Sequence, residues 1–259
     1  DLSVSSYIES KNTKELINIV DLNDQLRQTI KKINTLRTDI DLIIEKNENF
    51  QDNILQDVNV EWKPLGEVTF FSNGKGHEKV ISEGGKYIVV NSKFVSTGGK
   101  FAKYSNQQIS PLFIDDILIV MSDLPNGRAL AKTFLIDQND RYTLNQRIGR
   151  IAIRNERELL PKFLKYYLDR TPQLLRFNNG IDQTNLQKKQ ILDVNIPIPF
   201  PENPEKSIKI QKEIVSILDS FTILTTGLVN ELTTELETRK KQYEYFRNRL
   251  LSFPKDNLE

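Results

Sequence analysis

The sequence predicts an α+β fold in which one mixed α/β domain is flanked by two long α-helices that form an antiparallel coiled coil. Three observations lead to this prediction. Apolar residues follow a heptad near both ends of the chain, and short β-rich runs separated by polar turns fill the middle. The chain has no cysteine, which excludes a disulfide framework. The predicted parts are an arm and helix in 1–60, the mixed domain in 61–204 and the second helix in 205–259.

The first predicted helix covers residues 16–44. Its apolar residues alternate at three and four positions, as a coiled-coil seam requires. The seam residues are Ile19, Leu22, Leu26, Ile33, Leu36 and Ile40. The alternative is a helix that lies on its own globular domain, which would show a wider apolar stripe.

The second predicted helix begins near Pro204, a favourable first-turn residue, and ends at about Leu251. Its seam changes step after residue 228 and then continues through Leu232, Leu236, Tyr243, Phe246 and Leu250. The first part of the seam consists of Ile214, Ile217, Phe221, Leu224 and Leu228. This seam needs a partner, for which the helix at 16–44 is the candidate, and Gly227 is expected to mark a close approach of the helices or a bend.

The middle segment alternates between strands and turns. We predict strands at 87–91, 112–121, 132–136 and 148–153, then a helix from Pro161 to about Phe177. Residues 196–201, I-P-I-P-F-P, are predicted to be an extended exit outside any ladder, because proline breaks both helix and sheet. The aromatic side chains of Trp62, Phe70 and Phe71 are predicted to lie in the core.

Composition excludes several classes of function. No run approaches the roughly 18 apolar residues of a membrane span, and the N-terminus lacks the pattern of a signal peptide, so a cytoplasmic location is predicted. With no cysteine and His77 as the only histidine, multi-histidine and cysteine metal sites are excluded. The only methionine is Met121, so we expect the chain to be part of a longer polypeptide.

Charge is distributed unevenly along the chain. The net charge is +1, but residues 61–200 contain 20 basic and 14 acidic residues, a net of +6. This excess is compatible with a polyanionic partner.

The polar turns of the middle segment contain the side chains that reading a DNA duplex requires. Arginine pairs with guanine, and asparagine or glutamine with adenine, while lysines contact phosphates. Base-reading candidates are therefore Arg128, Gln146, Arg147, Gln183 and Asn185. The full predicted DNA-binding set is Lys75, His77, Lys79, Lys93, Lys100, Lys103, Asn126, Arg128, Gln146, Arg147, Asp182, Gln183, Thr184 and Asn185. The alternative for each is an ordinary solvated loop residue, and Gln146 and Asn185 could instead brace their loops.

Four stretches resemble a known family. They are W-K-P-L-G-E-V at 62–68, N-N-G-I-D-Q-T-N-L at 178–186, I-L-D-V-N-I-P-I-P at 191–199 and R-K-K-Q-Y-E-Y-F-R-N-R-L-L at 239–251. This pattern resembles the specificity subunits of type I restriction-modification systems and the similar modules of type IIG enzymes. The resemblance implies a target-recognition domain on conserved coiled-coil helices, and sequence-specific recognition of double-stranded DNA.

The resemblance also implies partners. D-L-S-V-S-S-Y at 1–7, followed by a heptad helix, is similar to the C-terminal tail of the partner adenine methyltransferase, which suggests a fused polypeptide. The chain lacks the N-P-P-[F/Y] motif and the glycine-rich cofactor loop of such methyltransferases, so it is expected to be non-catalytic and to hold no cofactor. S-adenosylmethionine is expected only for the associated methyltransferase. The expected partners are double-stranded DNA, methyltransferase and restriction subunits or domains, and a second copy of the chain.

Two other classes of function are alternatives to this one. A metal-dependent nuclease would need a second acid near Asp182, and the sequence offers none at metal-ligand spacing. A coiled-coil adaptor or scaffold without DNA reading remains open, and it would show no salt-dependent affinity for duplex DNA.

Overall fold

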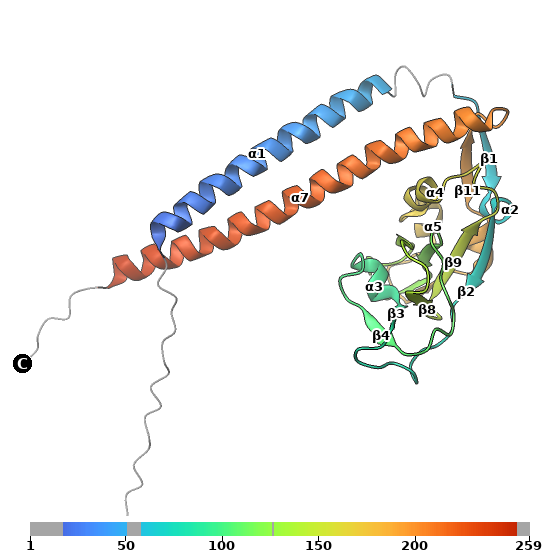
Figure 1. Ribbon diagram of the computed structural model, residues 1–259, viewed down its shortest axis with the longest axis horizontal. Coiled ribbons are helices and arrows are strands. Elements are labelled where there is room, and N and C mark those ends of the chain that lie inside the picture. The colour runs from blue at the N-terminus through green and yellow to red at the C-terminus, as the bar shows by residue number, and fades with distance from the viewer. Residues whose placement is uncertain (1–17, 51–57, 126, 253–259) are drawn as a thin grey trace, which may run out of the picture. The chain divides into compact units, whose positions relative to one another are not determined.

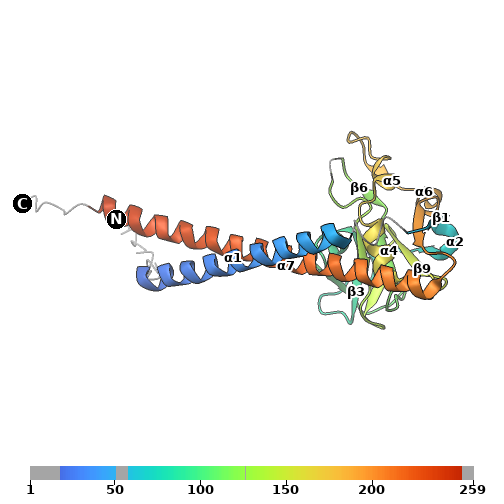
Figure 2. The same cartoon turned by 90° about the horizontal axis from the view of Figure 1, so that it is seen from above.

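The computed structural model describes residues 18–50, 58–125 and 127–252, and these form two compact units. The first, here called the helix pair, contains the described residues of Asp1–Asn47 and Ser220–Glu259. The second, the mixed unit, contains those of Glu48–Asp219. Figures 1 and 2 show the helices and strands of both. None of the helices in these three ranges combines the length and the apolar character that crossing a bilayer would need.

The helix pair joins α1 (Ile19–Phe50) to the second half of α7 (Pro204–Leu251). Asn18 caps α1, because its side-chain oxygen accepts a hydrogen bond from the backbone N–H of Val20 at 3.1 Å. Gln242 donates to Asn23 at 2.8 Å, and Lys32 pairs with Glu231 at 3.5 Å. As α1 advances, its partner on α7 moves back along the chain, so the helices are antiparallel. The predicted fold class, with its antiparallel coiled coil, is confirmed.

The α1 seam lies against α7. Leu22, Leu26 and Ile33 are buried, and Leu36 and Ile40 are half-buried. A Cβ on Gly227 would lie 3.5 Å from a methyl carbon of Leu36. That is ordinary van der Waals distance, so the two helices approach closely at this point without requiring glycine.

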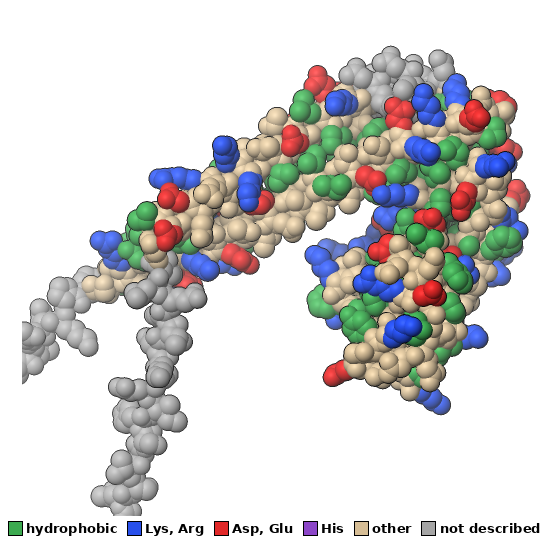
Figure 3. Space-filling view, viewed as in Figure 1, with side chains coloured by type: hydrophobic (Ala, Val, Ile, Leu, Met, Phe, Trp, Pro, Cys, Tyr) green, Lys and Arg blue, Asp and Glu red, His purple; other side chains and the backbone are tan. Residues whose placement is uncertain are grey.

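The α7 face that lies against α1 is not the predicted one. Its least exposed positions beyond residue 230 are mostly polar, namely Glu231, Glu235, Thr238 and Gln242, and the aromatic Tyr245 joins them. The predicted continuation of the seam is exposed instead, and with Val229 it forms what we call the outer stripe: Val229, Leu232, Leu236, Tyr243, Phe246 and Leu250. Leu232, Leu236 and Tyr243 each follow one of these inward positions by one residue, which turns them by about 100° around the helix. Figure 3 shows apolar side chains on the surface of the helix pair.

The first half of α7 belongs to the mixed unit. Ile210 is buried there, and Ile214 and Val215 pack against the core of that unit. The expectation that Ile214 belongs to the coiled-coil seam is therefore wrong. Ile217 is half-buried in the same segment, whereas Phe221, Leu224 and Leu228 are half-buried within the helix pair.

Small sheets build the mixed unit. A four-stranded antiparallel sheet has the order β2-β9-β5-β7, a three-stranded sheet has the order β4-β3-β8, and β1-β11 and β10-β6 are two-stranded. The strands are β1 (Val60–Pro64), β2 (Thr69–Asn73), β3 (Tyr87–Val90), β4 (Lys103–Ser105), β5 (Ile117–Val120), β6 (Ser122–Asp123), β7 (Thr133–Leu135), β8 (Tyr142–Leu144), β9 (Ile148–Ile153), β10 (Thr184–Asn185) and β11 (Asn195–Pro199). The short helices are α2 (Leu65–Val68), α3 (Ser92–Ser96), α4 (Pro161–Leu168), α5 (Pro172–Leu175) and α6 (Lys188–Leu192).

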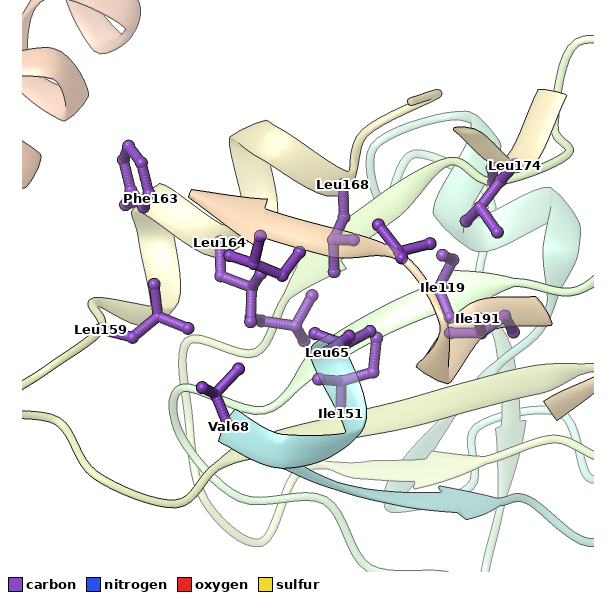
Figure 4. Packing of buried hydrophobic residues seen from close by; sticks show 14 of the residues in the cluster. Leu65, Val68, Ile119, Ile151, Leu159, Phe163, Leu164, Leu168, Leu174 and Ile191 are labelled. Carbon is purple, nitrogen blue, oxygen red and sulfur yellow. The ribbon is translucent and has the colours of Figure 1, made fainter. Parts of the chain in front are cut away.

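Two apolar clusters form the core of the mixed unit. The larger one joins the four-stranded sheet to α2, α4, α5 and α6, and Figure 4 shows its side chains meeting around Leu65 and Ile151. The smaller one lies on the other face of β5, where Leu118 and Val120 meet Phe94 and Leu144. Because both faces of β5 are buried, Ile117–Val120 is apolar throughout.

Two of the three aromatic residues predicted in the core are exposed. Trp62 and Phe70 are 58% and 57% exposed, whereas Phe71 packs against the larger cluster. Successive strand residues point to opposite faces, so Phe70 and Phe71 on β2 cannot both face one core. Phe70 lies instead beneath the guanidinium of Arg154, 3.9 Å from its ring centre.

Two proline-containing segments also differ from prediction. The helix expected at 161–177 ends at Leu168, and Pro172 begins the separate helix α5, because a residue before proline is driven out of the helical region. Residues 195–199 pair with β1 despite Pro197 and Pro199. The two prolines are two residues apart, so their backbone nitrogens point to the same edge of β11. That edge can face away from β1, where no N–H group is needed for pairing.

Candidate nucleic-acid interface

An open concavity of about 510 Å³ lies on the mixed unit, and predicted DNA-binding residues line it. Four segments contribute: the loop after β2, the start of α3, the chain before β4 and the turn between β8 and β9. The lining residues are Glu78, Asn91, Ser92, Lys93, Phe101, Ala102, Lys103, Asn145, Gln146 and Arg147. Cations, amides, a carboxylate and an aromatic ring therefore share one surface.

Local backbone contacts fix the walls of the concavity. Asn91 caps α3 by accepting a hydrogen bond from the Phe94 N–H at 3.0 Å, which places Lys93 in the first turn. The Asn145 N–H donates to the Val90 carbonyl at 3.1 Å, which holds the turn carrying Gln146 and Arg147 beside β3. Lys93 lies over the ring of Phe101, with its Nζ 4.6 Å from the ring centre.

His77 is fully buried, so the prediction that it contacts DNA is wrong for its side chain. Its Nδ1 lies 2.7 Å from the Lys75 carbonyl, which can only accept, so Nδ1 carries the proton. Its Nε2 lies 2.8 Å from the Thr143 hydroxyl, which then donates to it. The ring anchors the loop after β2 to β8 and thereby positions Lys75 and Glu78.

A two-stranded ribbon holds the second group of predicted residues. β10 pairs with β6, and Gln183 donates from Nε2 to the Ser122 hydroxyl at 2.8 Å. The Leu186 N–H donates to the Met121 carbonyl, and the Met121 N–H donates to the Arg147 carbonyl. Met121 therefore links the ribbon to the turn that lines the concavity, so the two groups of residues adjoin.

The loop that carries Arg128 is braced from two sides. The Asp123 carboxylate accepts hydrogen bonds from the N–H groups of Leu124, Ala129 and Leu130 at 2.7 to 3.1 Å. The guanidinium of Arg170 donates to the Arg128 carbonyl at 2.7 Å. Arg128 itself is exposed, as a residue that reaches a groove must be.

The other predicted residues are mostly at the surface. Lys75, Lys79 and Lys100 are exposed, as are Asp182 and Asn185, and Thr184 is half-buried. Asn126 lies outside the described residues. Figure 3 shows Lys and Arg side chains on the face of the mixed unit that is turned to the viewer. Sequence reasoning missed Glu78, Phe101, Asp123 and Arg170, because their roles arise from contacts with residues distant in the chain or from loop closure.

A match to a family model identifies the family of the chain. The family model described as type I restriction modification DNA specificity domain matches residues 57–238. The chain belongs to this specificity family. The predicted resemblance is therefore confirmed, whereas a fusion to a methyltransferase stays a prediction. Specificity domains of this family are non-catalytic and carry no cofactor, and S-adenosylmethionine belongs to the methyltransferase subunit.

Curated relatives agree with this assignment, and a solved structure shares the fold. The chain is 32% identical over 220 residues to the Escherichia coli type I restriction enzyme EcoR124I/EcoR124II specificity subunit, covering 82% of this chain and 49% of that subunit. It is 32% identical over 224 residues to the Escherichia coli EcoprrI specificity subunit, covering 82% and 54%. The specificity chain thus spans about half the length of these relatives. A chain from a solved type I R-M system has the same fold, with a TM-score of 0.52 at 15% identity over 86% of this chain and 55% of that one.

Proposed function

We propose that the mixed unit is a target-recognition domain that reads double-stranded DNA through the concavity and the adjoining ribbon. The observation that supports this most is the grouping of Lys93, Lys103, Gln146 and Arg147 on one open surface. Loops held by buried contacts can present these side chains without a large entropic cost on binding. Lysines then contact phosphates, and the amide and guanidinium groups read base edges in the major groove.

Salt dependence of DNA binding tests this proposal. The full chain should bind duplex DNA with an affinity that falls steeply with salt, because each phosphate contact releases counterions. Replacing Lys75, Lys100 and Lys103 together by Ala should weaken binding to all sequences and flatten the salt slope by about 3. Fluorescence anisotropy at several salt concentrations measures both.

A matched variant controls for net charge. Replacing Lys206, Lys209 and Lys212 by Ala removes the same charge from the first turns of α7 and should leave the slope near that of the unmodified chain. Equal slopes for both triple variants would contradict the proposed face. The coiled-coil adaptor remains the second candidate, and absence of any salt-dependent binding would favour it.

We further propose that two copies of the chain associate through the outer stripe, so that the dimer reads a two-part site. The α7 face toward α1 and the outer stripe are about 100° apart, close to the angle at which a helix of a four-helix bundle faces two neighbours. An antiparallel pairing of two α7 helices places Leu232 against Leu250 and Leu236 against Phe246 of the second copy. The same register places Glu235 beside Arg249, which have opposite charge.

Cross-linking tests this interface cleanly because the chain has no cysteine. In the proposed register Lys240 of one copy lies beside Lys240 of the other, on the flank of the seam. Lys240→Cys should therefore cross-link two copies with a short bismaleimide, whereas Lys241→Cys, one residue further around α7, should do so far less. Equal yields, or a monomer in light scattering at micromolar concentration, would exclude this interface.

We also propose that the chain assembles with methyltransferase and restriction subunits and acts on DNA in the cytoplasm. Support comes from the family, whose relatives are specificity subunits of type I restriction enzymes. Co-purification of the full chain with a methyltransferase subunit would test the first of these assemblies.

A further inference from the structure

One carboxylate lies among the cations of the concavity. Glu78 lines it together with Lys93, Lys103 and Arg147, but no ion pair joins Glu78 to a basic side chain in the described parts of the chain. Its partner is an amide, because Gln146 donates from Nε2 to Glu78 Oε1 at 3.2 Å. A Cβ on Gly76 would lie 2.7 Å from the other carboxylate oxygen, so a glycine at residue 76 leaves room for the Glu78 carboxylate.

A carboxylate on a DNA-binding face has an energetic cost. Phosphates approach the same surface, and their charge repels it. Glu78 therefore lowers affinity for DNA in general unless a base offers it a hydrogen bond. The hydrogen bond from Gln146 also orients the Gln146 amide, whose oxygen is then a second acceptor on this wall.

The donors in the major groove are few. Each is an exocyclic amine, the cytosine N4 or the adenine N6 group. Adenine presents its amine next to the N7 acceptor, which would face the second acceptor of the wall and be repelled. Cytosine presents its amine without a neighbouring acceptor on the same base, so a wall of acceptors favours cytosine.

Guanine, which pairs with this cytosine, offers acceptors that suit the Arg147 guanidinium. Guanine presents two acceptors, O6 and N7, which the guanidinium fork fits in a bidentate arrangement. Arg147 is exposed, and in the described parts of the chain its guanidinium makes no hydrogen bond or ion pair. Acceptors and a donor fork thus line one concavity.

We propose that Glu78 and Arg147 together read one C·G base pair, with the Glu78 carboxylate accepting from cytosine N4 and the Arg147 guanidinium donating to guanine. This inference rests on the proposed DNA-reading function. Gln146 is a positioning residue in it, because its amide holds the carboxylate in place.

Selection from a random duplex library tests the inference with the full chain. The unmodified chain should select C·G at one position, and Glu78→Ala should lose the preference at that position alone. Because removal of the carboxylate also removes repulsion, Glu78→Ala should bind non-cognate DNA more tightly. Glu83→Ala, which removes an exposed carboxylate from the same β2–β3 loop but outside the concavity, is the matched control and should change neither. Melting temperatures of the variants confirm that each remains folded.

Removing the amine from the DNA gives the complementary measurement. The selected cytosine is replaced by a 2-pyrimidinone nucleotide, which lacks the amine. This should weaken binding of the unmodified chain by roughly tenfold, and should have little effect on Glu78→Ala. Gln146→Ala should retain part of the discrimination.

The possible outcomes separate this inference from the function on which it depends. If the chain selects a sequence but Glu78→Ala keeps every preference, or if the affected position is not C·G, the inference is wrong and DNA reading stands. If the chain shows no sequence preference at all, the proposed function fails and the inference fails with it.

Discussion

Arg170 is a residue whose contribution comes from the backbone that it holds. It follows α4 with a positive φ of 53°, a conformation that costs energy for a residue other than glycine. In this position its guanidinium reaches the carbonyls of Arg128 and Leu130 at 2.7 and 3.5 Å. The strained backbone is therefore offset by contacts that fix the Arg128 loop.

Arg170→Lys should relax base discrimination without changing the general affinity for DNA. The lysine keeps the charge, but its shorter and more flexible side chain lacks the rigid planar guanidinium, so Arg128 is held less firmly. We expect a loss of about 1 kcal/mol of discrimination at one base pair, less than the roughly 1–3 kcal/mol expected for Arg128→Ala. Competition binding against single-base variants of the selected site measures it. An unchanged discrimination profile with an intact fold would show that Arg170 does not position Arg128.

Gly127 shows how tightly the same loop is closed. A Cβ there would overlap the Asp123 carboxylate, whose oxygens already accept three backbone N–H groups. Residue type alone predicted a polar turn at this place and gave Arg128 as a candidate. It could not reveal the brace, because Arg170 is more than forty residues away and nothing in its immediate sequence marks it.

At the scale of elements, α4 and α7 are clamped by Asp219. Its carboxylate accepts from Lys162 Nζ at 2.7 Å and from the Tyr166 hydroxyl at 2.6 Å. Burial raises the pKa of Asp219, but the hydrogen bonds from Lys162 and Tyr166 lower it more, so the net pKa lies below the ordinary value. A depressed carboxyl pKa stabilises the folded state above the unfolded-state pKa, and this stabilisation is lost as the pH falls.

Asp219→Asn should therefore destabilise the mixed unit at pH 7 by about 1 kcal/mol, a modest value because Lys162 is half exposed. Below about pH 4 the difference should shrink, since the carboxyl of the unmodified chain is then increasingly protonated. Urea unfolding of both proteins at several pH values measures the difference. A constant difference from pH 7 to pH 3 would rule out a charge-dependent clamp.

Hydrophobic periodicity predicts the extent of α7 but not the face through which it contacts α1. The heptads of both helices and the bounds of α7, Pro204 to Leu251, could be predicted because each depends on local spacing. Which face of α7 meets α1 could not, since the more apolar face is turned outward and polar residues such as Glu231 and Gln242 contact α1. A single sequence does not tell how many partners share a helix.

For the whole molecule, the proposed dimer makes the helix pair a spacer between two reading units. The length of this spacer can be changed by inserting eleven residues into each helix, after Arg37 in α1 and after Thr226 in α7. The two insertion points lie side by side, because Leu36 is next to Gly227. Eleven residues make about three turns, so both faces of α7 keep their direction. Each copy lengthens by about 16 Å and the dimer by about 33 Å, close to one turn of DNA.

The unspecified spacer of the two-part site should accordingly grow by about 10 base pairs while both half-sites stay the same. Selection from libraries of variable spacing measures this. A five-residue insertion is the control, because it turns the outer stripe by about 140° relative to the residues before Thr226, so the two reading units should no longer face one DNA duplex together. If the eleven-residue variant keeps the original spacing, the helices do not set it.

The pairing of β1 with β11 has a consequence for how such a protein can change. Val60 pairs with Pro199, so the chain enters and leaves most of the mixed unit through two adjacent strands. A segment between them that keeps the α4 residues in contact with α7, Lys162 and Tyr166, could be exchanged as a cassette whose two ends already lie side by side. A cassette with different loops would give a new DNA target while the helices and their partners stay unaltered. Grafting another domain between residues 64 and 195 is therefore a direct route to altered specificity.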